Sequence, residues 1–104
     1  MKKIMTAREL FNYIRTFETI RASMGDELNG FFTFIKVGEL KIDELNHSQR
    51  IYGKVMKHPQ KRDGSFSISG EQFECDIVEE DETNHIVTVT SDTMPFPVTL
   101  DLQR

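Results

Sequence analysis

The chain has 104 residues, of which 38% are hydrophobic and 29% charged, a composition typical of a globular protein rather than a disordered one. Its net charge of −4 argues against a general nucleic-acid binder. The single cysteine excludes an internal disulfide, and no apolar run approaches the ~18 residues of a membrane span. With no secretory signal at its N-terminus, we expect one cytoplasmic domain over residues 1–104, with no membrane contact.

Charge is divided unevenly along the chain. Residues 1–62 hold twelve of the thirteen Lys and Arg residues but only seven of the seventeen acids. Residues 63–104 hold one basic residue and ten acids, which makes the two parts about +5 and −9. The simpler interpretation is that the two parts lie on opposing strands and neutralise each other. The alternative is that they form separate interaction surfaces.

A helix is predicted over residues 6–24. Thr6 and Glu9 have the spacing of a capping box, and Met5 with Leu10 has that of a hydrophobic staple. Apolar residues recur at helical spacing, at Leu10, Tyr13, Ile14, Phe17, Ile20 and Met24. Gly25 then stands where a helix commonly ends. We expect the apolar stripe to pack in the core; the alternative is a dimer seam.

The segment over residues 26–45 fits two structures. The residues 27–37 match the helical template, but their β-prone composition and Gly30 favour a strand. Residues 39–45 alternate apolar and polar side chains, which predicts a second strand after a bend at Gly38.

The next segment reads as one long antiparallel hairpin. A turn is predicted at 46–48 and a strand at 50–57. Residues 58–64 contain Pro59 and the turn dipeptide Asp63-Gly64, so we expect a loop there.

Four short strands are predicted between Ser65 and Leu102, at 65–69, 73–79, 86–90 and 96–102. Their alternation places Phe66, Ile68, Phe73, Cys75, Ile77, Val87, Val89, Phe96, Val98 and Leu100 on the inner face. Pro97 places the last strand at a sheet edge or else marks where that strand starts.

These elements predict an α+β fold. We expect the N-terminal helix to pack on a curled antiparallel sheet, or on a small partly open β-barrel, of about five to seven strands. Since small sheets leave edges unpaired, a homodimer through a strand edge or through the helix is also expected.

The chain offers little catalytic chemistry. Cys75 lies between Glu74 and Asp76, which would raise the pKa of its thiol, and alternation points it inward, so we expect a buried structural residue. Its spacing from His47, His58 and His85 matches no zinc signature, and no glycine-rich phosphate loop, nucleophile elbow or H-E-x-x-H motif occurs. We therefore expect no metal, no cofactor and no enzymatic activity.

Two charged clusters are the candidate sites. The acidic run Glu79, Glu80, Asp81 and Glu82 falls at a predicted hairpin tip and lacks the central glycine of a calcium loop. Such a run is commonly a solvated turn, and its functional alternative is a patch that docks on a basic partner. The basic cluster comprises Arg50, Tyr52, Lys54, Lys57, Lys61 and Arg62. Cations interleaved with an aromatic residue suit a nucleic-acid phosphate backbone.

Three functions follow from these clusters. The first is a non-catalytic binding or regulatory protein that acts through a protein partner, using its charge-polarised surface. The second is a nucleic-acid-binding protein that uses the basic hairpin over residues 47–62. The third is a small-ligand pocket or an enzyme inside the curled sheet.

Overall fold

The computed structural model describes residues 1–24, 33–45, 47–54 and 65–104, which form one α-helix and nine strands. The helix is α1 (Ala7–Ile14), and a short 3-10 helix, η2 (Val37–Glu39), follows the third strand. The strands are β1 (Lys2–Met5), β2 (Thr19–Met24), β3 (Thr33–Lys36), β4 (Lys41–Asp43), β5 (Gln49–Lys54), β6 (Ser65–Gly70), β7 (Phe73–Glu79), β8 (Asn84–Thr90) and β9 (Val98–Gln103).

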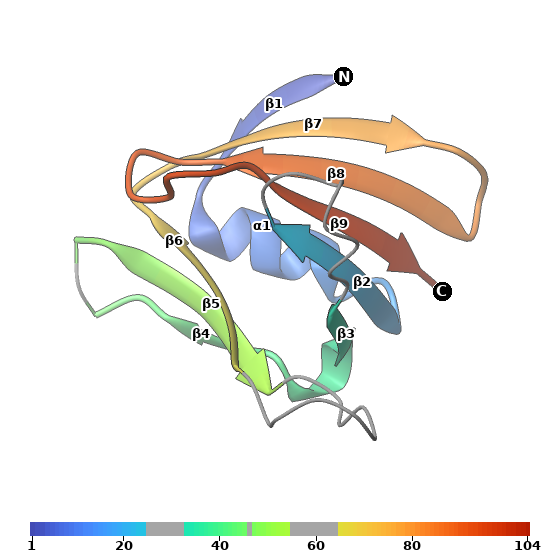
Figure 1. Ribbon diagram of the computed structural model, residues 1–104, viewed down its shortest axis with the longest axis horizontal. Coiled ribbons are helices and arrows are strands. Elements are labelled where there is room, and N and C mark those ends of the chain that lie inside the picture. The colour runs from blue at the N-terminus through green and yellow to red at the C-terminus, as the bar shows by residue number, and fades with distance from the viewer. Residues whose placement is uncertain (25–32, 46, 55–64) are drawn as a thin grey trace.

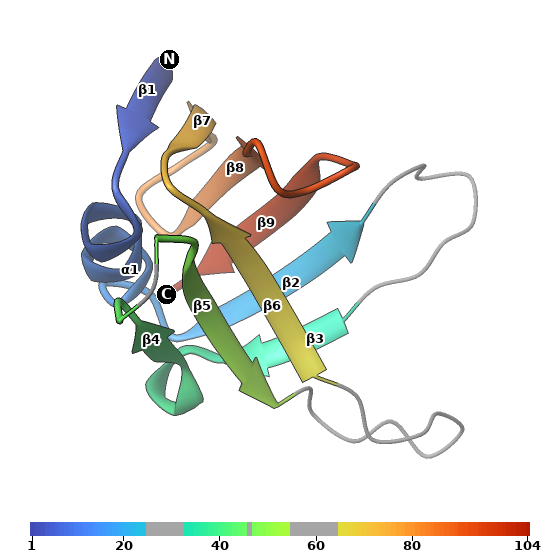
Figure 2. The ribbon, with the colours of Figure 1, turned by 90° about the vertical axis from the view of Figure 1, so that its left-hand side faces the viewer.

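The strands form two antiparallel sheets (Figure 1). The larger has the order β1-β7-β8-β9-β2-β3 and the smaller β4-β5-β6. Figures 1 and 2 show α1 between β1 and β4, one edge strand from each sheet. The predicted α+β fold, with an N-terminal helix on a curled antiparallel sheet, is confirmed, and the sheets formed by the described residues do not close into a barrel. Strands outnumber the expected five to seven because residues 2–5 and 19–24 add two that the apolar pattern did not reveal.

The helix starts where it was predicted to start. The Thr6 side chain accepts a hydrogen bond from the main-chain amide of Glu9 at 3.2 Å, and the Glu9 carboxylate accepts one from the Thr6 amide at 3.1 Å. The capping box is thus confirmed. These two reciprocal bonds satisfy main-chain amides that the first turn of a helix leaves without partners.

The predicted end of the helix at residue 24 is wrong, because α1 stops at Ile14. The Tyr13 carbonyl accepts from both the amide and the hydroxyl of Thr16, at 3.2 and 2.8 Å. These bonds replace the regular helical ladder, an effect that threonine side chains commonly have. Residues 19–24 then pair along their whole length with β9, from Thr19 opposite Gln103 to Met24 opposite Val98.

The link between the two sheets contains the predicted bend at Gly38. Residues 33–36 are a strand, which agrees with the expectation for that part of 27–37, whereas 25–32 lie outside the described residues. Gly38 lies within η2, and the Leu40 amide closes this turn on the Val37 carbonyl at 3.1 Å. The turn moves the chain from the edge of the larger sheet to the edge of the smaller one.

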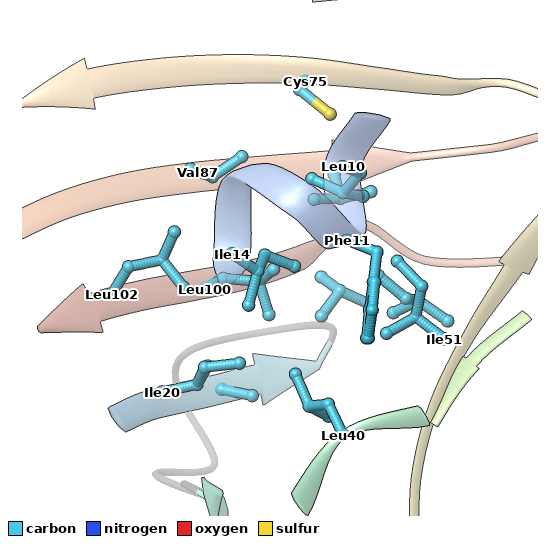
Figure 3. Close-up of a cluster of buried hydrophobic side chains, with 14 of the residues drawn as sticks. Leu10, Phe11, Ile14, Ile20, Leu40, Ile51, Cys75, Val87, Leu100 and Leu102 are labelled. Carbon is cyan, nitrogen blue, oxygen red and sulfur yellow. The ribbon is translucent and has the colours of Figure 1, made fainter. Parts of the chain in front are cut away.

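The core is one cluster of buried side chains drawn from α1 and from both sheets. Figure 3 shows Leu10 and Ile14 of α1 among Val87 and Leu100 of the larger sheet, with Ile51 of the smaller sheet nearby. The inward positions of β7, β8 and β9 follow strict alternation, as expected for strands with one buried face. Nine of the ten residues predicted for the inner face are buried, the exception being Phe96.

Phe96 is 60% exposed, so its predicted inward orientation is wrong. Strand β9 begins only at Val98, and Pro95 and Pro97 flank Phe96 without amides that could join a ladder. Of the two roles foreseen for Pro97, it marks the start of the strand, because β9 is an interior strand paired with both β8 and β2.

In the described residues, no helix is long and apolar enough to cross a membrane.

Candidate functional site

The acidic run forms the tip of the β7–β8 hairpin. Glu79 is the last residue of β7, and residues 80–83 connect it to β8. All four acidic side chains are exposed. We call Glu79, Glu80, Asp81 and Glu82 the acidic tip.

Asp81 shapes this turn. One of its carboxylate oxygens accepts hydrogen bonds from the Thr83 amide and hydroxyl, both at 2.7 Å, and from the Asn84 amide at 2.8 Å. Because these bonds favour the ionised carboxylate, those from Thr83 foremost, they lower the pKa of Asp81. Asp81 is therefore a structural residue of the turn as well as one of its charges.

The other three carboxylates of the acidic tip differ in whether they form a hydrogen bond. Glu80 accepts a hydrogen bond from the Asn84 side-chain amide at 3.0 Å. Glu79 and Glu82 form no side-chain hydrogen bond or ion pair with any described residue. The turn thus presents two unpaired carboxylates on a backbone that Asp81 fixes.

A polar pair lies beneath the acidic tip. His85, opposite Glu79 in the strand register, is only 8% exposed. Its Nδ1 shares a 2.6 Å hydrogen bond with the Tyr13 hydroxyl of α1. The Phe17 ring meets the His85 ring edge to face, with centroids 5.0 Å apart. Burial, followed by the charge of Glu79, raises the pKa of Tyr13.

Arg104 lies beside the acidic tip, but it binds main chain rather than carboxylates. Its guanidinium lies 4.5 Å from the centroid of the Phe17 ring and donates to the Glu82 carbonyl oxygen at 2.6 Å. Its amide donates to the Thr83 carbonyl oxygen at 2.9 Å. Arg104 and His85 line a shallow hollow with Glu79, Asp81 and Glu82.

Sequence reasoning missed Tyr13, Phe17, His85 and Arg104 as neighbours of the acidic tip. Tyr13 and His85 are 72 positions apart, and nothing in the local pattern connects them. The only available signal was the inward register of His85, since alternation places it on the face that carries Val87 and Val89.

The soft metal ligands of the described chain are scattered. Cys75 pairs with Val89 whereas His85 pairs with Glu79, so the two lie at different levels of the same hairpin. No group of three His, Cys, Asp or Glu side chains in the described ranges could hold a metal ion. His58 lies outside those ranges.

Cys75 is a buried residue, as predicted. It is 1% exposed, and burial raises the pKa of its thiol to about 11. Such a thiol stays protonated near neutral pH and is a poor nucleophile.

The described residues of the basic cluster, Arg50, Tyr52 and Lys54, lie on the smaller sheet. Arg50, Tyr52 and Lys54 alternate along β5 and so share the outer face of this sheet. The Arg50 guanidinium lies 4.5 Å from the centroid of the Tyr52 ring. Lys41, directly opposite Tyr52 on β4, adds a cation that the sequence did not mark. We call Lys41, Arg50, Tyr52 and Lys54 the basic face.

The remaining predicted members of the basic cluster, Lys57, Lys61 and Arg62, lie outside the described residues.

The acidic tip and the basic face are separate surfaces. Figure 1 shows the β7–β8 turn and the smaller sheet on opposite sides of the molecule. Two ion pairs join described residues to each other: the terminal amine with Asp76 at 3.5 Å, and Arg8 with Glu44 at 2.6 Å. Neither connects the two surfaces. Among the described residues, no ion pair therefore joins the acidic tip to the basic face, whereas Lys2 of the basic part lies opposite Asp76 of the acidic part in the strand register.

Comparisons of the chain with family models, with curated proteins and with solved structures find no match.

Proposed function

We propose that this chain is a small non-catalytic binding or regulatory protein that acts through a basic protein partner. The acidic tip is the surface that meets this partner. The observation that carries the proposal is the pair of exposed carboxylates on Glu79 and Glu82, which have no partner in the described chain and stand on a turn fixed by Asp81.

Two physical effects support this function. Unpaired charges of one sign steer an oppositely charged partner during its approach. The hydrogen bonds of Asp81, together with Arg104 bonded to two carbonyl oxygens of the turn, hold the backbone in one shape. A surface that is already ordered loses less conformational entropy when it binds.

A binding role suits these carboxylates better than acid-base chemistry. A general acid near neutral pH needs a raised pKa. The hydrogen bonds on Asp81 act in the opposite direction and lower its pKa.

Location and assembly remain predictions. We place the protein in the cytoplasm on the ground of its single thiol. The predicted homodimer would form through a strand edge, because the apolar side chains of α1 are buried in its own core.

The test of the acidic tip uses a fluorescent oligolysine peptide and measures its anisotropy. Replacing Glu79 and Glu82 with Gln should weaken binding about 3- to 10-fold, the effect of two exposed charge pairs. The matched control, Glu18→Gln with Glu39→Gln, removes the same charge from exposed positions outside the acidic tip and should change affinity less. Equal losses in both variants would show that net charge, and not this site, holds the peptide.

A second candidate function, single-stranded nucleic-acid binding, is favoured by the basic face. Three cations and one aromatic ring share a sheet surface there, and the Arg50 guanidinium already stacks on Tyr52. Cations track phosphates, while rings and guanidinium planes stack on bases.

The test of this candidate measures the anisotropy of a labelled oligothymidylate at ~50 mM salt. Arg50→Glu with Lys54→Glu should abolish binding, and the equally charged variant Lys2→Glu with Lys36→Glu should retain most of it. A wild-type chain that leaves the oligonucleotide free at this salt concentration contradicts the basic face as a nucleic-acid site.

A further inference from the structure

Three neighbouring surface hollows, which together we call the trench, contain no residue of the acidic tip. The first lies at the β4–β5 turn and is lined by Leu45 and Glu71. The second shares Glu71 with the first and extends to Ile4 and Asp92. The third shares Ile4 and Glu74 with the second and runs along the outer face of β1, β7 and β8. Shared lining residues place the three hollows side by side.

Two aliphatic side chains stand exposed in this trench. Leu45 is 94% exposed and Ile4 is 63% exposed. Single exposed aliphatic residues are common on protein surfaces, but these two line neighbouring hollows. The β4–β5 turn does not need the Leu45 side chain for its shape, because Asp43 holds it by accepting from the Leu45 amide at 3.0 Å.

The carboxylates that line the trench determine which kind of ligand could cover Leu45 and Ile4. Glu71, Glu74 and Asp92 are exposed and form no ion pair with any described residue. Asp76, at the β1 end, binds the terminal amine at 3.5 Å. Lys2 and Lys3 line the third hollow beside Glu74 and Asp76, whereas the first two hollows are lined by Glu71, Glu74 and Asp92 without a Lys or Arg residue. The trench is therefore negative in its first two hollows, which favours a ligand that carries cations there.

One wall of the trench is held rigid. Ser91 and Thr93, in the β8–β9 loop, both donate to the Ser69 carbonyl oxygen, at 2.5 and 2.7 Å. Ser91 itself lines the second hollow. A wall fixed by two hydrogen bonds needs little ordering when a ligand enters.

We propose that this trench binds an extended segment of a partner protein in which aliphatic side chains alternate with Lys or Arg. The aliphatic groups cover Leu45 and Ile4, and the cations meet Glu71, Glu74 and Asp92. These carboxylates repel a polyanion, and a row of neighbouring hollows suits an extended chain better than a compact small molecule. The proposal is independent of the acidic tip, and either surface can function without the other.

The test uses a short labelled peptide in which Leu alternates with Lys, and a second peptide with Ser in place of Leu. Fluorescence anisotropy at ~50 mM salt should show tighter binding of the Leu peptide. Leu45→Ser combined with Ile4→Ser should weaken that binding about tenfold, because two aliphatic contacts are lost. Glu71→Gln with Glu74→Gln should also weaken it.

The matched control is Val78→Ser. It removes an aliphatic side chain of β7 that is 52% exposed and that lines none of the three hollows. It should leave affinity unchanged while Ile4→Ser alone lowers it. The proposal fails if the wild-type chain does not bind the Leu peptide at ~1 mM, if both peptides bind equally, or if Val78→Ser weakens binding as much as Ile4→Ser.

Variants of the acidic tip separate this proposal from the proposed function. Glu79→Gln with Glu82→Gln should leave affinity for the Leu peptide within about threefold of wild type. A larger loss than in the trench variants would overturn the trench and leave the acidic tip as the binding surface.

Discussion

The hydrogen bond between Tyr13 and His85 should contribute to the stability of the fold. It joins α1 to the larger sheet at the base of the acidic tip, and the imidazole it engages is almost fully buried. Tyr13→Phe should therefore lower the free energy of unfolding by about 1–2 kcal/mol, the net value of the bond plus the cost of an unsatisfied ring nitrogen. Urea unfolding followed by circular dichroism measures this change.

Tyr52→Phe provides the control for that substitution. The Tyr52 hydroxyl forms no hydrogen bond with a described residue, and its ring would still lie against Arg50. Its effect should stay within about 0.5 kcal/mol, the usual range of a surface substitution. Equal losses in the two variants would show that the Tyr13 hydroxyl contributes nothing specific.

The thiol of Cys75 should make stability depend on alkaline pH. Its pKa in the folded chain is about 11, raised from an ordinary value of 9.0 by burial. Because the unfolded thiol loses its proton first, this contribution is complete below pH 9.0 and disappears as pH rises through about 11. Cys75→Ala should flatten the fall in the free energy of unfolding between pH 9 and 10, measured by urea unfolding; an unchanged slope would contradict this assignment.

At the scale of the elements, the sequence predicted the features that depend on neighbouring residues. It did not predict the features that depend on pairing with a distant strand. The capping box of Thr6 and the alternation of β7 and β8 depend on neighbouring residues, and the sequence predicted both. The end of α1 depends on pairing with a distant strand. Ile20 and Met24 fit a helical stripe and an alternating strand equally well, so only the ladder to β9 decides between them.

The junction between β6 and β7 depends on one glycine. Gly70 has a φ of +158°, and a Cβ there would lie 2.6 Å from the Ser91 Cβ, which no side-chain rotation can move away. Gly70→Ala should therefore cost about 1–3 kcal/mol of unfolding free energy. Gly38→Ala is the control, because nothing lies within 4 Å of its Cβ position, and it should be neutral or stabilise by about 0.4–1 kcal/mol. Thermal unfolding distinguishes the two, and equal melting temperatures would contradict the steric argument.

At the scale of the whole molecule, the distribution of charge along the chain was visible in the sequence, but its arrangement in space was not. The count of acids in residues 63–104 predicted an acidic surface. In the structure, Glu79 and Glu82 are exposed at the tip of the β7–β8 hairpin. Which charges meet depends on the order of strands in the two sheets. That order puts Arg50 and Lys54 in a different sheet from the acidic tip, a separation set by non-local pairing.

The shared core predicts that both sheets unfold together. Ile51 of the smaller sheet and Leu100 of the larger one belong to the same buried cluster, with Leu10 of α1 among them. A single core of this kind should give one cooperative transition. Labelling of Cys75 reports on the larger sheet, and tyrosine fluorescence from Tyr52 and Tyr13 reports on the smaller sheet and the helix; the two should give the same urea midpoint.

A core substitution in one sheet should shift both probes equally. Ile51→Ala removes a fully buried side chain from the smaller sheet and should cost about 2–5 kcal/mol. If the chain is one domain, Cys75 in the larger sheet becomes reactive at the same lowered urea concentration at which tyrosine fluorescence changes. A midpoint for Cys75 that stays at the wild-type value would mean that the sheets unfold separately, and that the continuous cluster does not couple them.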